Sequence, residues 1–397
     1  MPLRSKILNL LILIVLAVLF AAGIHAALQG NPLGADFYTF WKAARAEFFE
    51  GRSAYDPSVA REIQMDIQGR LSNPTEDQFA FSYPIFALLL VAPFSLLPFD
   101  WAQATWMAVN FVLLLTASLA ISSHRRWVGA SVWAFYPVCF ALILGNLDLI
   151  IAVLWLFFFS QVLPQNKGRY GNTLWMGALI SVTTIKPQFS WFFLILAALI
   201  ALRQKSTRLM LGFLAGSAVL WSLGFLWHPH WLNEWVAQAV QYLTVLSGHS
   251  SPLQSWLATL TPPNDQTARS ITWVIIIALS IWFIRSAWRN HSFSIRLLGW
   301  CGIVTYFVHP TGFSYEQMTF LIPVFLWAVD ERSSRKALAA WVGMLILSWV
   351  ALVATFTGID RLADSSWLLL AAAAWLVWIT IDQKWSQPGK IQSASQS

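Results

Sequence analysis

Charge is scarce in this chain of 397 residues, since Asp, Glu, Lys and Arg together make up 11% of it. Soluble domains carry about a quarter. Hydrophobic residues account for 57%, with 24 Trp and 28 Phe. Long stretches are apolar all round instead of alternating apolar and polar faces, which argues against an ordinary soluble core. These features predict an all-α integral membrane fold with many crossings.

Cysteine and metal-binding patterns are also rare. The two cysteines, Cys139 and Cys301, lie in apolar stretches without metal or redox spacing, and we expect them to pack as small hydrophobic residues. No Asp-X-Asp triplet occurs, and the histidines of HPHW at 228–231 have a poor helical metal spacing. We therefore expect neither a metal nor another cofactor.

Basic residues are present, with a net charge of +7, but they form short clusters between apolar segments. Cytoplasmic loops of membrane proteins have this pattern, so the charge indicates orientation in a membrane and not nucleic-acid binding. If every cluster is cytoplasmic, the chain crosses about 12 times and both termini are cytoplasmic. We expect a single transmembrane domain over residues 1–385 and a disordered cytoplasmic tail over 386–397.

The apolar segments fit this threading with one exception. Ile7 to Leu28 is longer than the apolar part of a cleavable signal sequence and is interpreted as an uncleaved first helix. Pro84 to Leu97 is short and contains proline, which favours a re-entrant or interfacial element. The other expected crossings are 101–122, 128–144, 147–163, 171–185, 187–202, 209–227, 271–288, 296–308, 317–329, 337–356 and 366–382.

The unusual polar residues gather where helices meet one membrane surface. Apart from Asp148, which starts a helix, the middles of the crossings contain no Asp, Glu, Lys or Arg. This pattern predicts chemistry at the outer, extracytoplasmic face. The threading places these segments there: 29–82, 145–148, 185–188, 228–270, 309–316 and 357–365.

The first outer segment contains the stretch DFYTFWKAARAEFFEGRSAYDP at 36–57. Its apolar residues recur at helical spacing, so we predict an amphipathic helix at the outer surface, ended by Gly51. Asp36 precedes the first apolar position, where an N-cap residue belongs. An interfacial helix can also hold a functional carboxylate at the headgroup boundary. The residues leave both roles open.

The order of several motifs along the chain is more specific than any one of them. The motifs are the stretch at 36–57, FSYPIFALLLVAPFSLLP at 81–98, WMAVNFVLLL at 106–115, GNLDLIIAVLWLFFF at 145–159, IKPQ at 185–188 and HPTGFSYEQ at 309–317. In this order the chain resembles glycosyltransferase family 87, within the GT-C class of polyprenyl-phosphate-sugar-dependent enzymes. The resemblance covers most of the chain and is strongest through residues 34–188.

The resemblance implies a GT-C type polytopic helical bundle and an acidic residue of the first outer loop as catalytic base, here Asp36. A carboxylate that deprotonates the acceptor hydroxyl would suffice, because a sugar on a lipid phosphate already has a good leaving group. One-step attack inverts the anomeric centre. A retaining double displacement would need a second carboxylate nearby, and other acidic residues of the loop leave that open.

The resemblance also implies the substrates and the location. The donor is expected to be a polyprenyl-phosphate hexose, with mannose favoured by the family and a pentose as an alternative. The acceptor is expected to be a lipid-linked glycan or an envelope polysaccharide. The enzyme is expected in the plasma (inner) membrane, in contact with membrane lipids, with its active site on the extracytoplasmic face.

Two cationic residues are candidates for binding the donor phosphate. Lys186 follows an apolar helix and precedes Pro187, where its ammonium would meet a headgroup phosphate or snorkel towards phospholipid. His309 would donate to the phosphate or to developing charge, or else cap a helix. A late outer-face His supports the functional role by resemblance. Candidate sugar or acceptor contacts, each with a structural alternative, are Tyr55, Tyr83, Asn146, Asp148, Gln188 and Glu316.

The rival interpretation from another class is a transporter or flippase of a lipid-linked sugar. Such a protein would also cross the membrane many times. It should have polar or ionisable residues near the bilayer midplane and often has two related halves. Neither feature is evident in this sequence, which favours the enzyme.

Overall fold

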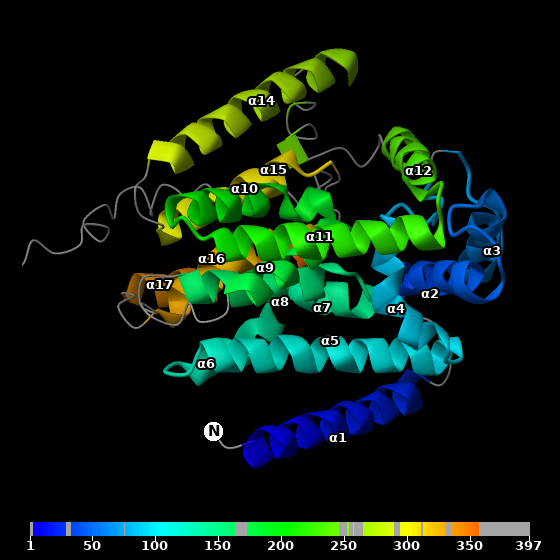
Figure 1. The fold of residues 1–397 in the computed structure, drawn as a ribbon, viewed down its shortest axis with the longest axis horizontal. Coiled ribbons are helices and arrows are strands. Elements are labelled where there is room, and N and C mark those ends of the chain that lie inside the picture. The colour runs from blue at the N-terminus through cyan, green and yellow to red at the C-terminus, as the bar shows by residue number, and fades with distance from the viewer. Residues whose placement is uncertain are drawn as a thin grey trace, which may run out of the picture.

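The computed structural model describes residues 3–28, 33–74, 76–162, 173–245, 252–253, 257, 265–289, 294–310, 313–330 and 335–356. Within these residues the regular structure is helical throughout and contains no β-strand, as the sequence predicts (Figure 1). The expected segment 366–382, the loop 357–365 and the tail lie outside the described residues.

The helices fall into three groups. The long ones are α1 (Leu3–Leu28), α5 (Phe99–Ile121), α11 (Thr207–Trp227), α14 (Asp265–Arg289) and α17 (Arg335–Phe356). The shorter apolar ones are α6 (Arg126–Ala130), η2 (Ser131–Ala134), α7 (Tyr136–Leu144), α8 (Asp148–Val162), α9 (Thr173–Ser181), η4 (Val182–Ile185), α10 (Pro187–Arg203), α15 (Ile295–Val308), η6 (Ser314–Gln317) and α16 (Met318–Val329). The third group is α2 (Ala35–Phe49), α3 (Pro57–Gln68), η1 (Ile85–Ala87), α4 (Leu88–Ser95) and α12 (Trp231–Val245).

Every expected crossing between residues 101 and 356 coincides with a helix or with a bent helix pair, but in the described chain fewer of these helices than expected are long enough to span a membrane. Five helices of the described chain are long and apolar enough to cross a membrane. A sixth is added if Arg126–Ala134 and Tyr136–Leu144, which meet at 60°, form one span. Several other apolar helices have 10–17 residues, shorter than the roughly 20 that cross the hydrocarbon. The expected count of about 12 crossings is therefore not confirmed.

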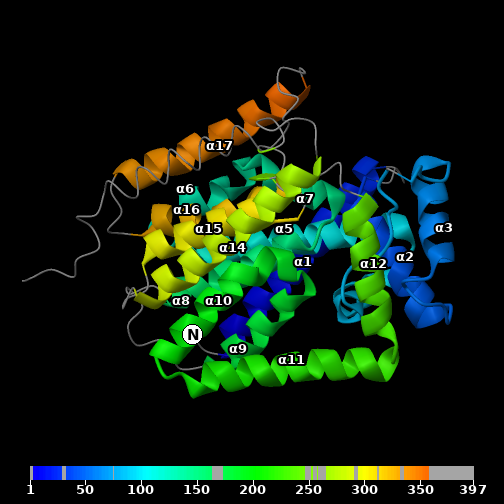
Figure 2. The same ribbon diagram turned by 90° about the horizontal axis from the view of Figure 1, so that it is seen from above.

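The end of the bundle that carries α2, α3 and α12 lies on the right in Figures 1 and 2. The end of α1 and the start of α5 meet there, because the His25 ring stacks on Trp101 at 3.9 Å between centroids. The His25 Nδ1 atom also lies 3.6 Å from an oxygen of Asp100. The chain from 29 to 98 therefore begins and ends at the same end of the bundle. Residues 84–97 make no full crossing, in agreement with the sequence.

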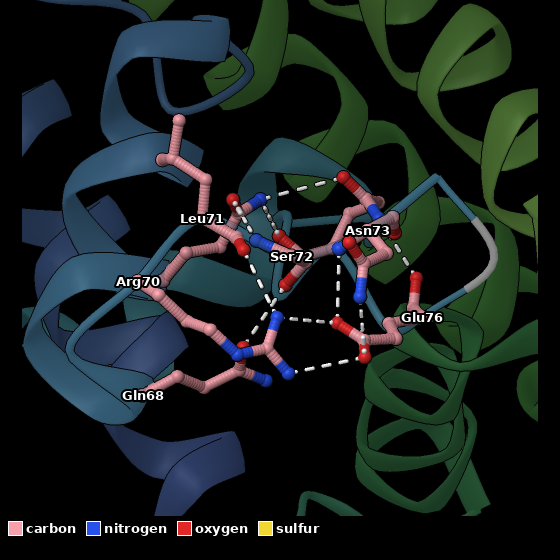
Figure 3. Close-up of polar contacts among 8 residues, drawn as sticks. Gln68, Arg70, Leu71, Ser72, Asn73 and Glu76 are labelled. Atoms are coloured by element: carbon pink, nitrogen blue, oxygen red, sulfur yellow. Dashed lines mark hydrogen bonds and ion pairs between the residues drawn. The ribbon is translucent and has the colours of Figure 1, made fainter.

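Two helices and a clamped loop form the cap at this end. The amphipathic helix α2 appears as predicted, and Gly51 follows it with φ +66°. The sequence analysis missed α3, which Asp56 caps by accepting a 2.7 Å hydrogen bond from the Ser58 amide. After α3, Arg70 donates to both oxygens of Glu76 at 2.7 and 3.0 Å, which closes the next loop (Figure 3).

Small residues let α9 and α11 pack with their backbones in contact. A Cβ on Gly177 would collide with the Leu209 carbonyl, and a Cβ on Gly212 would collide with the Leu174 carbonyl. Gly216, one turn after Gly212, lies against Ser181 in the same way. A glycine pair four residues apart is a common way for membrane helices to approach closely. This contact fixes α9, and through η4 it fixes the start of α10.

Candidate active site

Asp36 lies in the first turn of α2, at the capped end of the bundle. The N-cap residue of α2 is Gly34, so the alternative that Asp36 is the N-cap is wrong. Gln103 of α5 holds the start of the helix by accepting hydrogen bonds from the amides of Leu33 at 3.1 Å and Gly34 at 3.4 Å. These bonds fix the start of α2 and with it the position of Asp36. The residue remains partly exposed to solvent.

The turn between α7 and α8 supplies the partner of Asp36. Asn146 Nδ2 donates to Asp36 Oδ2 at 2.7 Å. The preceding residue, Gly145, has φ +72°, and a Cβ there would collide with Phe37 of α2. Trp106 fastens the turn from α5 by donating to the Gly145 carbonyl at 2.9 Å. Because Gly145 has no Cβ and tolerates a positive φ, the turn can pack in close contact with α2.

The environment of Asp36 shifts its proton affinity. Burial raises the pKa of Asp36 to about 6. The Asn146 hydrogen bond and the charge of Lys186 lower the pKa, whereas the charges of Asp77 and Asp148 raise it. The carboxylate is thus ionised at neutral pH and more basic than an ordinary aspartate, which suits a general base.

Lys186 and Asp148 form a buried ion pair. The Lys186 ammonium lies 2.7 and 2.9 Å from the two Asp148 oxygens, and the side chains are 2% and 0% exposed. The ammonium also lies 5.0 Å from the centre of the Tyr315 ring. Because the side chain points into the protein, snorkelling of Lys186 towards phospholipid is wrong.

His309 and Glu316 form a second buried pair across the α15–η6 connection. His309 Nδ1 lies 2.8 Å from Glu316 Oε2, and both side chains are buried. His309 follows the last residue of α15, and Glu316 lies in η6. Both predicted cations are therefore paired with carboxylates from the predicted contact set. Asp36, in contrast, has the neutral amide of Asn146 as its direct side-chain partner.

The remaining predicted residues occupy different positions. Tyr55 is buried, and its hydroxyl donates to the Tyr83 carbonyl at 2.6 Å, so it ties the first loop together. Burial raises the pKa of Tyr83 well above its usual value, and the charges of Asp36, Asp148, Glu316 and Asp77 add to the effect. Gln188 is a partly exposed residue in the first turn of α10.

Tyr242 was missed by the sequence analysis. It lies in α12, within a segment expected to be an outer loop. Burial raises the pKa of its hydroxyl, and the negative charges of Asp77, Asp36 and Glu316 contribute to the shift. The helical spacing of the apolar residues in 231–245 was the available signal for this helix. Three of the four carboxylates that act on Tyr83 thus also act on Tyr242.

Potential metal ligands do not cluster in the described ranges of the chain. These ranges contain no group of three or more His, Cys, Asp or Glu side chains arranged to hold a metal ion. At the HPHW motif, His228 lies between two glutamates, with Nδ1 3.0 Å from Glu47 and Nε2 3.2 Å from Glu234. This histidine therefore joins the end of α11 to α2 and α12.

The fold and the site define a helical membrane protein with buried ionisable side chains gathered at one end of its bundle. The model of glycosyltransferase family 87 matches residues 81–310, more than half of the chain, and the chain belongs to this family. It is accordingly a membrane glycosyltransferase. No curated protein and no solved structure matches the chain.

The extent of this match differs from the extent of the resemblance in the sequence. The matched region begins after α3, so Asp36 lies before it, and it extends past 188 to include the predicted residues up to His309. Glu316 lies just beyond it. Asp36 joins the matched region through its contact with Asn146.

Proposed function

We propose that the protein is an inverting glycosyltransferase that moves a hexose, with mannose favoured, from a polyprenyl-phosphate donor to a lipid-linked or envelope glycan. The reaction takes place at the extracytoplasmic face of the plasma membrane. The observation that carries the proposal is Asp36, a partly open carboxylate with a pKa of about 6, bonded to a neutral amide in a cluster with Lys186.

The chemistry requires one base. Asp36 accepts the proton of an acceptor hydroxyl as the hydroxyl oxygen attacks the anomeric carbon of the donor sugar. The bond between that carbon and the phosphate oxygen breaks, and the lipid phosphate leaves with the bonding electrons. Asp148 lies in an ion pair with Lys186 and Glu316 contacts His309, so of these three carboxylates Asp36 is the one available to act on the acceptor, which supports a single-step reaction.

A lipid donor suits the position of the cluster. Leu226, at the end of α11, is 82% exposed. The next residue, Trp227, packs against Phe48 of α2 at 4.3 Å between ring centroids. Exposed apolar surface thus continues from a membrane-length helix to the helix that carries Asp36. A lipid-borne phosphate in the bilayer would approach Lys186 from this end of the bundle.

The test is transfer of radiolabelled sugar from a purified polyprenyl-phosphate donor to a membrane glycolipid acceptor, without added nucleotide sugar. Asp36→Asn should fold normally and lose transfer, because the amide keeps the shape and loses the basicity. The control is Asp66→Asn, which alters a carboxylate of the same cap that bonds Tyr38 at 2.5 Å. We expect this control to retain transfer.

Three results would contradict parts of this proposal. Wild-type turnover by Asp36→Asn, at equal amounts of folded protein, removes Asp36 as the base. Transfer that requires a nucleotide sugar removes the polyprenyl-phosphate donor. Movement of the donor across the bilayer without a new glycosidic bond favours the transporter.

A further inference from the structure

The buried side-chain amide of Asn146 donates one hydrogen bond and accepts another. Its Nδ2 donates to Asp36 Oδ2 at 2.7 Å, and its Oδ1 accepts from the Asp148 backbone amide at 3.0 Å. We propose that Asn146 is a positioning residue that holds Asp36 in the orientation and charge state of a general base. This inference rests on the proposed function and assigns Asn146 a role other than contact with sugar.

The amide cannot turn over without losing both bonds. A flipped group would place its NH₂ against the Asp148 N–H and its oxygen against the Asp36 carboxylate, and both contacts would be repulsive. The backbone N–H of Asp148 is a donor only, so it fixes which end of the Asn146 side chain faces Asp36. The donor to the carboxylate is thus set by the backbone N–H two residues further along the chain.

The surroundings also prevent the side chain from moving aside. Asn146 is 1% exposed, and its backbone amide donates to the Ala141 carbonyl at 2.9 Å. Trp106 donates a hydrogen bond to the carbonyl of the preceding residue, Gly145. These contacts hold the backbone of the turn in place. The Asn146 side chain therefore extends to Asp36 from a fixed position.

The bond has two consequences for a proton transfer. It occupies one acceptor position on Oδ2 of Asp36, which leaves Oδ1 the more available oxygen for the proton of the attacking hydroxyl. It also stabilises the ionised carboxylate against the effect of burial, because a donated hydrogen bond favours the charged form. In agreement with the geometry, the Asn146 bond lowers the pKa of Asp36 while burial raises it.

The experiment is the pH dependence of kcat/KM for transfer by the purified full-length protein. Asn146→Ala should move the midpoint of the acid limb upwards by about one pH unit, since a charge-assisted hydrogen bond is worth about that much or more. The loss of kcat/KM relative to wild type should be largest below the midpoint and should become smaller at alkaline pH. Asn146→Asp keeps the shape and adds a neighbouring carboxyl, so its midpoint should rise further.

The matched control is Asn110→Ala in α5. Asn110 is also a buried amide, and its Nδ2 donates within its own helix to the Trp106 carbonyl at 2.9 Å. Losing it removes a similar group without removing a bond to Asp36. The midpoint of this variant should coincide with that of the wild type, which would show that a shift is not a general result of losing a buried amide.

The outcomes separate this inference from the proposed function. If Asp36→Asn is inactive and both Asn146 variants lose activity evenly at all pH values, the function stands and the positioning role is overturned. If Asn146→Ala does not fold, the near-isosteric Asn146→Asp decides the question alone. If Asp36→Asn transfers sugar normally, the proposed base and its positioning residue both fail.

Discussion

At the scale of single residues, the candidate site surrounds Asp36 with ionisable side chains that contact one another in pairs. The Lys186 ammonium contacts both Asp148 oxygens, and His309 contacts Glu316, all within buried surroundings. Removing one member of a buried ion pair costs about 3–5 kcal/mol, because the other charge is left without compensation. A single substitution at Lys186 would therefore confuse a binding defect with a folding defect.

A double variant separates the two effects. Lys186→Met combined with Asp148→Asn removes both charges with similar volumes, so thermal unfolding of the double variant should lie closer to wild type than that of Lys186→Met alone. If Lys186 also binds the donor phosphate, the double variant should lose about ten- to a hundred-fold in donor kcat/KM, from a charge-assisted contact of about 1.5–3 kcal/mol. A folded double variant with unchanged donor kinetics would limit Lys186 to a structural role.

The sequence identified many of the polar residues that meet, but not their partners. Asp36, Asn146, Asp148 and Lys186 could be found because they are polar residues at the ends of apolar segments. That Asp148 would neutralise Lys186 depends on how α8 and α10 pack, and no local pattern encodes it. The pairing of Asp36 with Asn146 likewise joins residues 110 positions apart.

At the scale of elements, one histidine joins the helices α11, α2 and α12. His228, at the end of α11, contacts Glu47 of α2 and Glu234 of α12. Glu234 also accepts a 2.6 Å hydrogen bond from Ser53, in the turn between α2 and α3. With a carboxylate at each ring nitrogen, both nitrogens must donate, so the contact favours the protonated imidazolium. The charge of His228 therefore supports the link between α2 and α12.

This link should weaken as pH rises. Burial opposes protonation of His228, but hydrogen bonds and charges from Glu234 and Glu47 outweigh it and raise the pKa above 6.5. A raised folded-state pKa gives stability that is fully present below about pH 6.5 and is lost as pH passes the folded-state value. Hydrogen exchange of α12 amides, corrected for intrinsic rates, should therefore show less protection above that pH.

The control for this prediction is the neighbouring exposed histidine. His228→Gln should show lower protection of α12 at acidic pH and little further change with pH. His230→Gln should follow the wild type, because His230 is exposed in the same motif. Equal pH dependence in wild type and His228→Gln would mean that another group controls the junction.

The sequence predicted the apolar helices better than the polar ones. Helix α2 was found because Phe37, Phe40, Ala44 and Phe48 recur at helical spacing. Helix α3 was missed because its residues are largely polar, although Asp56, Pro57 and Gly69 are start and stop signals. The number of membrane spans was not predictable from composition, since apolar helices of 10–17 residues occur beside full-length ones.

At the scale of the whole molecule, the bundle has two chemically different ends. The candidate site and the cap lie at one end, where α1 finishes and α5 begins (Figure 1). At the other end, Arg125 donates to the Ala328 carbonyl in the last turn of α16 at 2.7 Å, and Arg203 donates to the Trp288 carbonyl near the end of α14. Basic residues thus gather at the end opposite the candidate site. The bias of basic loops towards the cytoplasm predicts that this second end is cytoplasmic.

Single cysteines at the two ends should test this orientation. In a background with Cys139→Ala and Cys301→Ala, Met65→Cys on α3 should react with a membrane-impermeant maleimide in spheroplasts. Arg126→Cys and Lys205→Cys, both at exposed positions, should react only after the membrane is opened. If position 65 is protected and 126 and 205 label from outside, the protein has the opposite orientation and the site faces the cytoplasm. If 65 and 126 both label in intact spheroplasts, α5 does not separate the two compartments, because these positions lie beyond opposite ends of that helix.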